Sequence, residues 1–134
     1  MGRTITLQAA DGAAEAYLAP GPADTPHAGV LLFIDAIGLR PRIEEMADRI
    51  AGWGYTVLAP NVFYRAGSAE ELAPRTDLRE PGAREAFFAG MGNRREGMTA
   101  TGLKRDIACY LDALAGQPGV DGARIGVTGY CMGG

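Results

Sequence analysis

The chain has 134 residues, of which 47% are hydrophobic, so it can form the core of a single domain and is unlike a disordered chain. Its 13 basic and 16 acidic residues give a net charge of −3. This balance argues against a nucleic-acid partner, because phosphate binding draws on a concentrated positive face.

The N-terminus has no apolar signal core, and no apolar run approaches the length that crosses a membrane. We therefore expect a cytoplasmic protein without a membrane partner, either a monomer or a small homo-oligomer. Two cysteines in such a chain do not suggest a disulfide, and Cys109 is expected to be half-buried on a helix. The doublet Arg94-Arg95 is expected in a solvated loop. No metal site and no cofactor is expected.

The first 60 residues predict an edge hairpin followed by a strand, a helix and a second strand. Residues 3 to 8 and 14 to 18 are short strand candidates on either side of Asp11-Gly12, a pair suited to a tight turn. Residues 30 to 34 form a continuous apolar run, typical of a parallel strand that is buried on both faces. A helix is predicted to begin at Pro41 and to stop at Gly52, and residues 55 to 59 form the next strand. This order predicts a right-handed crossover unit.

Residues 60 to 100 interrupt this rhythm and form an irregular insertion, rich in proline, glycine and charged residues. Only two short helices are expected there, at residues 68 to 72 and 83 to 89. Ser68 and Glu71 have the spacing of a capping box at the start of the first one. An insertion after the carboxyl end of a strand either carries substrate contacts or is a mobile surface loop, and the pattern leaves both open.

The last third predicts an amphipathic helix with its apolar residues between 103 and 114, a turn at residues 117 to 122, and a buried strand at residues 124 to 128. We expect this strand to be central in a complete sheet. The only histidine, His27, follows a proline-rich stretch and is expected to be a solvated loop residue rather than a catalytic base.

The most informative stretch is Gly-Tyr-Cys-Met-Gly-Gly at residues 129 to 134. A glycine, any residue, a nucleophile, any residue and a glycine after a buried strand predict a strained turn that presents the nucleophile above the sheet. Cys131 is the predicted nucleophile, and backbone N–H groups at such a turn favour its thiolate. The N–H of Met132 is the expected first donor to the oxyanion of an acyl transfer.

With this turn and this strand order, the chain resembles the dienelactone hydrolase family, and the sharpest matches are residues 33 to 41 and 124 to 134. The resemblance implies an α/β fold with a mostly parallel α/β-hydrolase-type sheet. It implies that residues 1–134 are one incomplete domain, the N-terminal part of that fold, ending at the nucleophile elbow. It also implies hydrolysis of a small-molecule lactone or carboxylic ester through a cysteine acyl-enzyme. Because the family uses Cys, Asp and His in that chain order, the catalytic Asp and His are expected beyond Gly134.

The resemblance also suggests residues around the thiol and the substrate. Asp35 matches an acidic residue that the family places near the resting cysteine, where well-studied members have a glutamate. The N–H of Ala36 would be the second oxyanion donor. Arg84 with Phe87 or Phe88, and Tyr64 from the segment after the strand at 55 to 59, match the side of the site that holds an anionic substrate group.

Two other interpretations remain. Thr128, Gly129 and Gly133 also satisfy the start of the dinucleotide-binding turn of short-chain reductases, although that turn normally follows the first strand. The chain could alternatively be an inactive fragment or an interaction piece, since it has no catalytic base of its own. A strand left unpaired at residues 124 to 128 would then be prone to aggregation.

Overall fold

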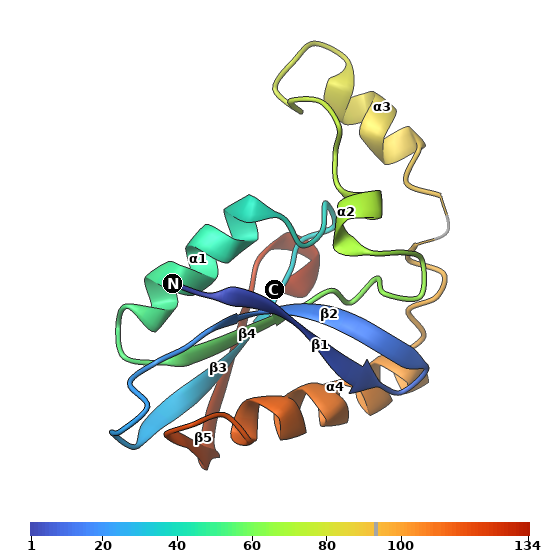
Figure 1. The fold of residues 1–134 in the computed structure, drawn as a ribbon. Helices are drawn as coiled ribbons and strands as arrows, with labels where there is room; N and C mark the ends of the chain where they lie inside the picture. Colours follow the sequence, from blue (N-terminus) through green and yellow to red (C-terminus); the bar gives the residue numbers. More distant parts are fainter. Residues whose placement is uncertain (93) are drawn as a thin grey trace.

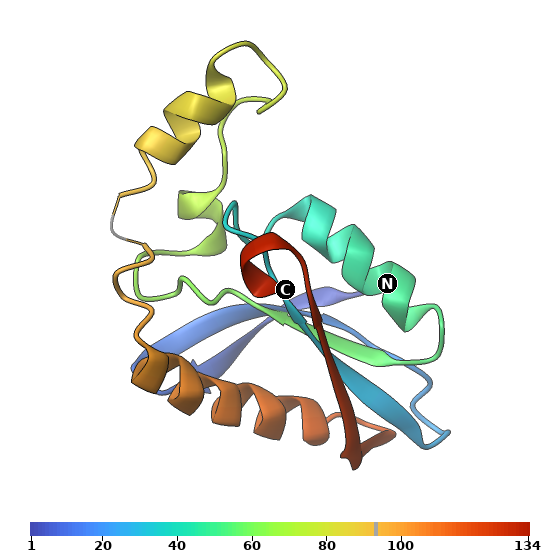
Figure 2. The same ribbon diagram turned by 180° about the vertical axis from the view of Figure 1, so that it is seen from behind.

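The computed structural model describes residues 1–92 and 94–134 and shows an α/β fold with a five-stranded mixed sheet. Figures 1 and 2 show helices α1 and α4 on opposite faces of this sheet. The elements in chain order are β1 (Arg3–Ala9), β2 (Gly12–Ala19), β3 (His27–Phe33), α1 (Pro41–Ala51), β4 (Thr56–Pro60), α2 (Ala69–Leu72), α3 (Ala83–Ala89), α4 (Ala100–Ala115), β5 (Val120–Gly129) and a short 3-10 turn, Cys131–Gly133.

The strand order is β1-β2-β4-β3-β5, and the pairing divides the sheet into two parts. The hairpin of β1 and β2 forms one edge and joins β4 in antiparallel fashion, whereas β3 pairs in parallel with both β4 and β5. The predicted edge hairpin and the predicted parallel strands are therefore confirmed. Parallel strands align their carboxyl ends at one edge of the sheet, which is where α/β folds place their sites.

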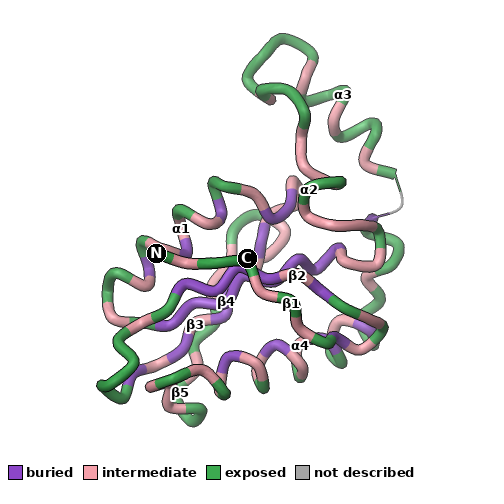
Figure 3. The backbone as a smooth tube through the Cα atoms, in the orientation of Figure 1, coloured by how far each residue is buried: buried purple, intermediate pink, exposed green. Residues whose placement is uncertain are grey.

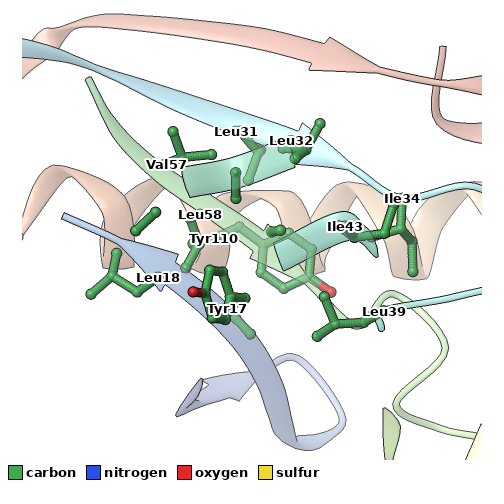
Figure 4. Packing of buried hydrophobic residues seen from close by; sticks show 14 of the residues in the cluster. Tyr17, Leu18, Leu31, Leu32, Ile34, Leu39, Ile43, Val57, Leu58 and Tyr110 are labelled. Atoms are coloured by element: carbon green, nitrogen blue, oxygen red, sulfur yellow. The ribbon is translucent and has the colours of Figure 1, made fainter. Parts of the chain in front are cut away.

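The core is formed by the strands whose sequences are continuously apolar. Every residue of β4 is buried, and in β3 the neighbours Leu31 and Leu32 have no exposed surface. Figure 4 shows them beside Val57 and Leu58 of β4. Ile43 from α1 and Tyr110 from α4 cover the two faces of these strands. Strands with helices on both faces need apolar side chains on both sides, and this explains the absence of alternation in their sequence.

Helices α1, α2 and α3 begin and end within one residue of where their sequences predict. Helix α1 starts at Pro41, which needs no backbone donor in the first turn, and buries Ile43, Ala47 and Ile50. At the start of α2, the Ser68 hydroxyl accepts the N–H of Glu71, as the capping pattern predicts. Helix α4 begins earlier than its apolar pattern indicates, because the Thr99 hydroxyl accepts the N–H of Gly102 and caps a further turn.

The last strand, β5, lies at the end of the strand order with β3 as its one neighbour among the described residues. It starts at Val120, inside the predicted turn, because that residue pairs with His27 of β3. Val127 of β5 is 63% exposed, and Figure 3 shows β5 intermediate and exposed beside the buried β3 and β4. An apolar residue this exposed on a strand is unusual and marks a face available for packing.

The expectation that His27 is a solvated loop residue is wrong. His27 is the first residue of β3 and only 7% exposed. Its Nδ1 lies 2.7 Å from the Thr25 carbonyl oxygen, and its Nε2 lies 2.7 Å from the Thr56 hydroxyl. Because the carbonyl can only accept, Nδ1 carries the proton and Nε2 accepts from Thr56. The backbone N–H of His27 also donates to Gly119, so pairing with a distant segment extends the strand to this residue.

We predict that His27→Ala lowers the free energy of unfolding by about 1–3 kcal/mol, because it leaves the buried Thr56 hydroxyl without its acceptor. Urea denaturation of the wild type, His27→Ala, Thr56→Val and the double variant measures the coupling between the two side chains. An unfolding midpoint that His27→Ala leaves unchanged would show that the imidazole does not stabilise the fold.

Candidate active site

The thiol of Cys131 is presented by a strained turn. Cys131 follows β5 and has a φ of 56°, and it is the one non-glycine residue with a positive φ in the described chain. This left-handed conformation is costly for a residue with a Cβ and is typical of a nucleophile elbow. Cys131 is exposed, whereas Cys109 on α4 is half-buried as expected. The structure thus has Cys131 at the turn, the position predicted from the sequence.

Close backbone contacts explain the two glycines of the elbow. A Cβ on Gly129 would overlap the carbonyl oxygen of Gly133. A Cβ on Gly133 would lie 2.6 Å from the carbonyl oxygens of Phe33 and Ile34, too close for any side chain. The elbow is therefore pressed against the segment that leaves β3. Its own backbone closes through hydrogen bonds from Gly133 N to Tyr130 O (3.0 Å) and from Gly134 N to Cys131 O (3.1 Å).

The register of β3 and β5 brings Asp35 and Cys131 to the same edge of the sheet. Phe33 pairs with Gly129, and Asp35 and Cys131 each follow their paired residue by two positions. Figure 2 shows the C-terminal turn beside the loop that leaves β3. Residues 35–38 of this loop, called the Asp35 loop below, thus lie next to the elbow.

The carboxylate of Asp35 is fully engaged within its own loop. Its Oδ1 accepts the N–H groups of Ile37 (3.1 Å) and Gly38 (3.2 Å), and Arg40 binds both oxygens at 2.8 and 3.0 Å. Burial alone would raise the pKa of Asp35, but the Arg40 guanidinium and the Gly38 and Ile37 amides outweigh it and hold the pKa below its usual value. Among the described residues no hydrogen bond joins Asp35 to Cys131.

The two expected oxyanion donors belong to the two segments that meet at the elbow. Ala36 lies in the Asp35 loop and Met132 in the elbow, and both are half-buried. Within residues 1–92 and 94–134, neither backbone amide donates a hydrogen bond to another group. Backbone amides at an elbow that bind no protein acceptor are suited to a developing negative charge.

The structure brings Arg84 and Phe88 together but places Tyr64 elsewhere. The Arg84 guanidinium lies 5.0 Å from the centre of the Phe88 ring, and no described carboxylate is within 4 Å of it. Arg84 lines a groove of about 640 Å³ that extends to Ile37 of the Asp35 loop. The other residues that line this groove are Arg40, Pro41, Arg42, Ala73, Pro74, Thr76, Asp77, Leu78 and Arg79.

Tyr64 belongs to a polar cluster next to the hairpin of β1 and β2. Its hydroxyl donates to Asp106 (2.8 Å) and accepts the N–H of Asp11 (3.0 Å), and burial followed by Asp106 raises its pKa. Asp106 is completely buried and is also bound by Arg65 at 2.7 Å. This cluster joins α4 to the hairpin and leaves the Tyr64 hydroxyl occupied.

Two arginines that contact the Asp35 loop were not recognised in the sequence. Arg40 follows Asp35 by five residues, and an aspartate, a glycine and an arginine in this close spacing could have suggested a looped ion pair. Arg94 was expected to be solvated, and this expectation is wrong: it is 7% exposed and donates to the carbonyls of Ile37 and Leu72. No local pattern marks it, since its partners lie 57 and 22 residues away along the chain.

In the part of the chain that the structure describes, no three His, Cys, Asp or Glu residues are grouped as a metal would need. Across the same residues, none of the helices combines the length and the apolar character needed to traverse a bilayer.

Comparisons with known proteins identify the family of the chain. Residues 14–134 match the model of the dienelactone hydrolase family. Carboxymethylenebutenolidase 1 of Cupriavidus pinatubonensis is 29% identical over 120 residues, which cover 89% of this chain and 47% of that protein.

Among solved structures, a proposed dienelactone hydrolase from Klebsiella pneumoniae superposes with a TM-score of 0.70 at 22% identity, covering 99% of this chain and 50% of the other. A dienelactone hydrolase-like promiscuous phosphotriesterase from metagenomic libraries gives a TM-score of 0.63 at 24% identity, with 99% and 50% coverage. At these identities the two structures show the fold alone.

The chain thus spans about half the length of the relatives and structures that it matches. The names of these proteins lend no support to the reductase interpretation of residues 128 to 133. The family model covers nearly the whole chain, including the elbow and the Asp35 loop, and the chain belongs to the dienelactone hydrolase family.

Proposed function

We propose that the intact protein hydrolyses lactones or carboxylic esters through an acyl-enzyme on Cys131. The observation that carries this proposal is the elbow itself: an exposed thiol in a left-handed conformation, with amides in the elbow (Met132) and in the adjoining loop (Ala36) that bind no acceptor among the described residues. Strain at one residue persists only where the surrounding structure enforces it, and it is concentrated at functional sites.

The chemistry follows from these groups. The Cys131 thiolate attacks the carbonyl carbon, a C–S bond forms, and the carbonyl electron pair moves to the oxygen, which the Ala36 and Met132 amides stabilise. Collapse breaks the C–O bond, and the leaving alkoxide takes up a proton. Water then attacks the thioester, which releases the carboxylic acid and restores the thiol. Two N–H donors aimed at the oxyanion lower the barrier because they bind the transition state more strongly than the substrate.

The base for these steps has to come from outside residues 1–134. His27, the one histidine of the chain, lies at the start of β3 and is held by Thr25 and Thr56. The seven residues of β3 separate it from the carboxyl edge by about 20 Å at about 3.3 Å per residue. A general base needs hydrogen-bond reach of the thiol. A histidine oriented by an aspartate, both beyond Gly134, fits the order of catalytic residues that the family resemblance implies.

Asp35 differs from the expected partner of the thiol. Its two oxygens already receive two amide N–H groups and a bidentate arginine, which uses the acceptor capacity that faces its own loop. We infer that Asp35 acts with Arg40 to shape the Asp35 loop and so to orient the Ala36 amide. The aspartate side chain is one methylene shorter than that of glutamate, which suits hydrogen bonds to the N–H groups of its own loop.

The substrate is proposed to carry an anionic group. Arg84 has an aromatic ring on one side and no described acidic partner, and its groove reaches the loop that carries the Ala36 amide. Arg79 lines the same groove, but Asp77 holds it at 2.7 Å. A guanidinium without an acidic partner is the group that can bind a ligand carboxylate in bidentate fashion.

The proposed function leads to three predictions, of which the first concerns Cys131. Cys131→Ala is expected to reduce kcat for a p-nitrophenyl ester at least a thousandfold, because acyl transfer loses its nucleophile. Rapid quenching followed by mass spectrometry should find the acyl group on Cys131, and hydroxylamine should remove it. Cys109→Ala is the matched control and should keep full activity. An acyl group on another residue, or substantial activity in Cys131→Ala, would contradict the mechanism.

The second prediction concerns the pH dependence of the Asp35 interaction. The pKa of Asp35 is lower in the folded state than in the unfolded state, so the ion pair stabilises the fold above the ordinary aspartate pKa of about 3.9 and loses its effect as the pH falls through the lower, folded value. Asp35→Asn should therefore lower stability by about 1 kcal/mol between pH 6 and 8, and this difference should shrink below about pH 4.

Chemical denaturation at several pH values measures this difference. Asp77→Asn is the control, because Asp77 also binds an arginine but lies on the exposed insertion, and it should have no measurable effect. A loss of stability in Asp35→Asn that is the same at pH 3 and pH 7 would mean that the charge of Asp35 is not what stabilises the loop.

The third prediction concerns Arg84. Arg84→Gln should raise KM about ten- to a hundredfold for an ester or lactone with a carboxylate, since a charged hydrogen bond contributes about 1.5–3 kcal/mol. KM for a neutral p-nitrophenyl ester should not change. Arg79→Gln removes a charge from the same groove but breaks only a pair with Asp77, so it serves as the control. Equal effects of Arg84→Gln on anionic and neutral substrates would exclude a role in binding the anionic group.

A further inference from the structure

Arg94 is a buried cation in the irregular insertion without an acidic partner. It is 7% exposed, whereas the neighbouring Arg95 is exposed. Within the described residues no carboxylate lies within 4 Å of its guanidinium, and burial lowers its pKa. Taking a charge out of water is costly unless the surrounding groups compensate for it. Neutral groups therefore have to stabilise the buried guanidinium of Arg94.

The guanidinium contacts four parts of the chain. One terminal nitrogen donates to the Ile37 carbonyl of the Asp35 loop at 3.3 Å, and the other donates to the Leu72 carbonyl at the end of α2 at 3.1 Å. The guanidinium carbon lies 5.6 Å from the centre of the Phe63 ring and 5.3 Å from that of Phe87 on α3. Carbonyl oxygens and aromatic faces are the neutral groups that stabilise a cation.

The Asp35 loop is thereby held from two sides. The Asp35 carboxylate binds the N–H groups of Ile37 and Gly38 from within the loop, and Arg94 binds the Ile37 carbonyl from the insertion. Ala36 lies between Asp35 and Ile37, the residue whose N–H and carbonyl are both bound. An oxyanion donor contributes fully only when it is fixed before the reaction, because reorienting a dipole during the reaction costs energy.

We propose that Arg94 is a positioning residue that holds the Asp35 loop, and with it the Ala36 amide, in the geometry that stabilises the oxyanion, and that it connects this loop to α3. The proposal rests on the proposed function of Cys131 and Ala36. It deepens that function, because it gives the insertion a role in the chemical step in addition to substrate contact. Helix α3 carries both Phe87, which packs against Arg94, and Arg84, which lines the groove.

The identity of the side chain fits this role. The planar fork of an arginine can donate to two carbonyls in different directions while its face lies against an aromatic ring, and a lysine cannot do both. Arg94→Lys should therefore keep the charge but lose one attachment, and Arg94→Met should lose both. Arg95→Met, a variant of the exposed neighbouring arginine, is the matched control.

The test compares these variants in the full-length protein with a neutral p-nitrophenyl ester, which does not depend on Arg84. Arg94→Met is expected to lower kcat about tenfold or more with little change in KM, because a misplaced donor weakens only the transition state. Arg94→Lys should fall between Arg94→Met and the wild type, and Arg95→Met should match the wild type. Millimolar guanidinium ion should partly restore kcat in Arg94→Ala, where the truncated side chain leaves room for it.

A second measurement does not depend on activity. Hydrogen exchange of the peptide that contains Ile37 and Gly38 should be faster in Arg94→Met than in Arg95→Met. Phe87→Leu, a change at a half-buried residue, removes one ring from Arg94 without removing the guanidinium and should give smaller changes of the same kind. This variant decides the question if Arg94→Met does not fold.

The outcomes separate the two proposals. If Cys131→Ala keeps its activity, the proposed function fails, and hydrogen exchange alone then reports whether Arg94 holds the loop. If Cys131→Ala is inactive but Arg94→Met and Phe87→Leu have the kcat of Arg95→Met, positioning by Arg94 is wrong. A rise in KM without a fall in kcat would also overturn it, because it would assign Arg94 to substrate binding.

Discussion

The parallel pairing of β3 with β5 is the constraint on which the candidate site depends. It sets Phe33 opposite Gly129, so that the chain leaves both strands at the same level and the elbow has to turn directly above the end of β3. The contact of Gly133 with the carbonyls of Phe33 and Ile34 leaves no room for a side chain. A shift of the pairing by one residue would turn the apolar side chains of β5 to the other face and move Cys131 away from the Asp35 loop.

Three parts of the molecule differ in how their charged side chains are paired. The carboxylate of the Asp35 loop, which adjoins the elbow, is bound by Arg40. Near the hairpin, the buried Asp106 is neutralised by Arg65 and fixes α4 to β1 and β2. In the groove, by contrast, Arg84 has only an aromatic ring beside it. Among the arginines that line this groove, Arg84 is the one without an ion pair in the described residues, since Arg40, Arg42 and Arg79 each bind an acid.

Much of this arrangement could be predicted from the sequence, because it depends on local patterns. The continuous apolar run of β3, the proline that begins α1, the Ser68 cap and the glycines of the elbow all act over a few residues. The roles of polar side chains could not be predicted in this way. Two buried polar residues bind partners far away along the chain: His27 hydrogen-bonds to the Thr56 hydroxyl, 29 residues away, and Arg94 to the Ile37 carbonyl, 57 residues away. Burial of a polar group depends on its partners, and the pairing of distant segments is not encoded in local composition.

The left-handed backbone conformation of Cys131 favours glycine at this position. A residue with a Cβ in the left-handed conformation costs about 1–2 kcal/mol, and glycine occupies the same conformation at no such cost. For folding alone, glycine would be the better residue at this position, as it is at Gly129 and Gly133 around it. At position 131 the stability of the turn therefore favours glycine, whereas the proposed chemistry requires a cysteine. The chain has the cysteine, at the expense of a less stable turn.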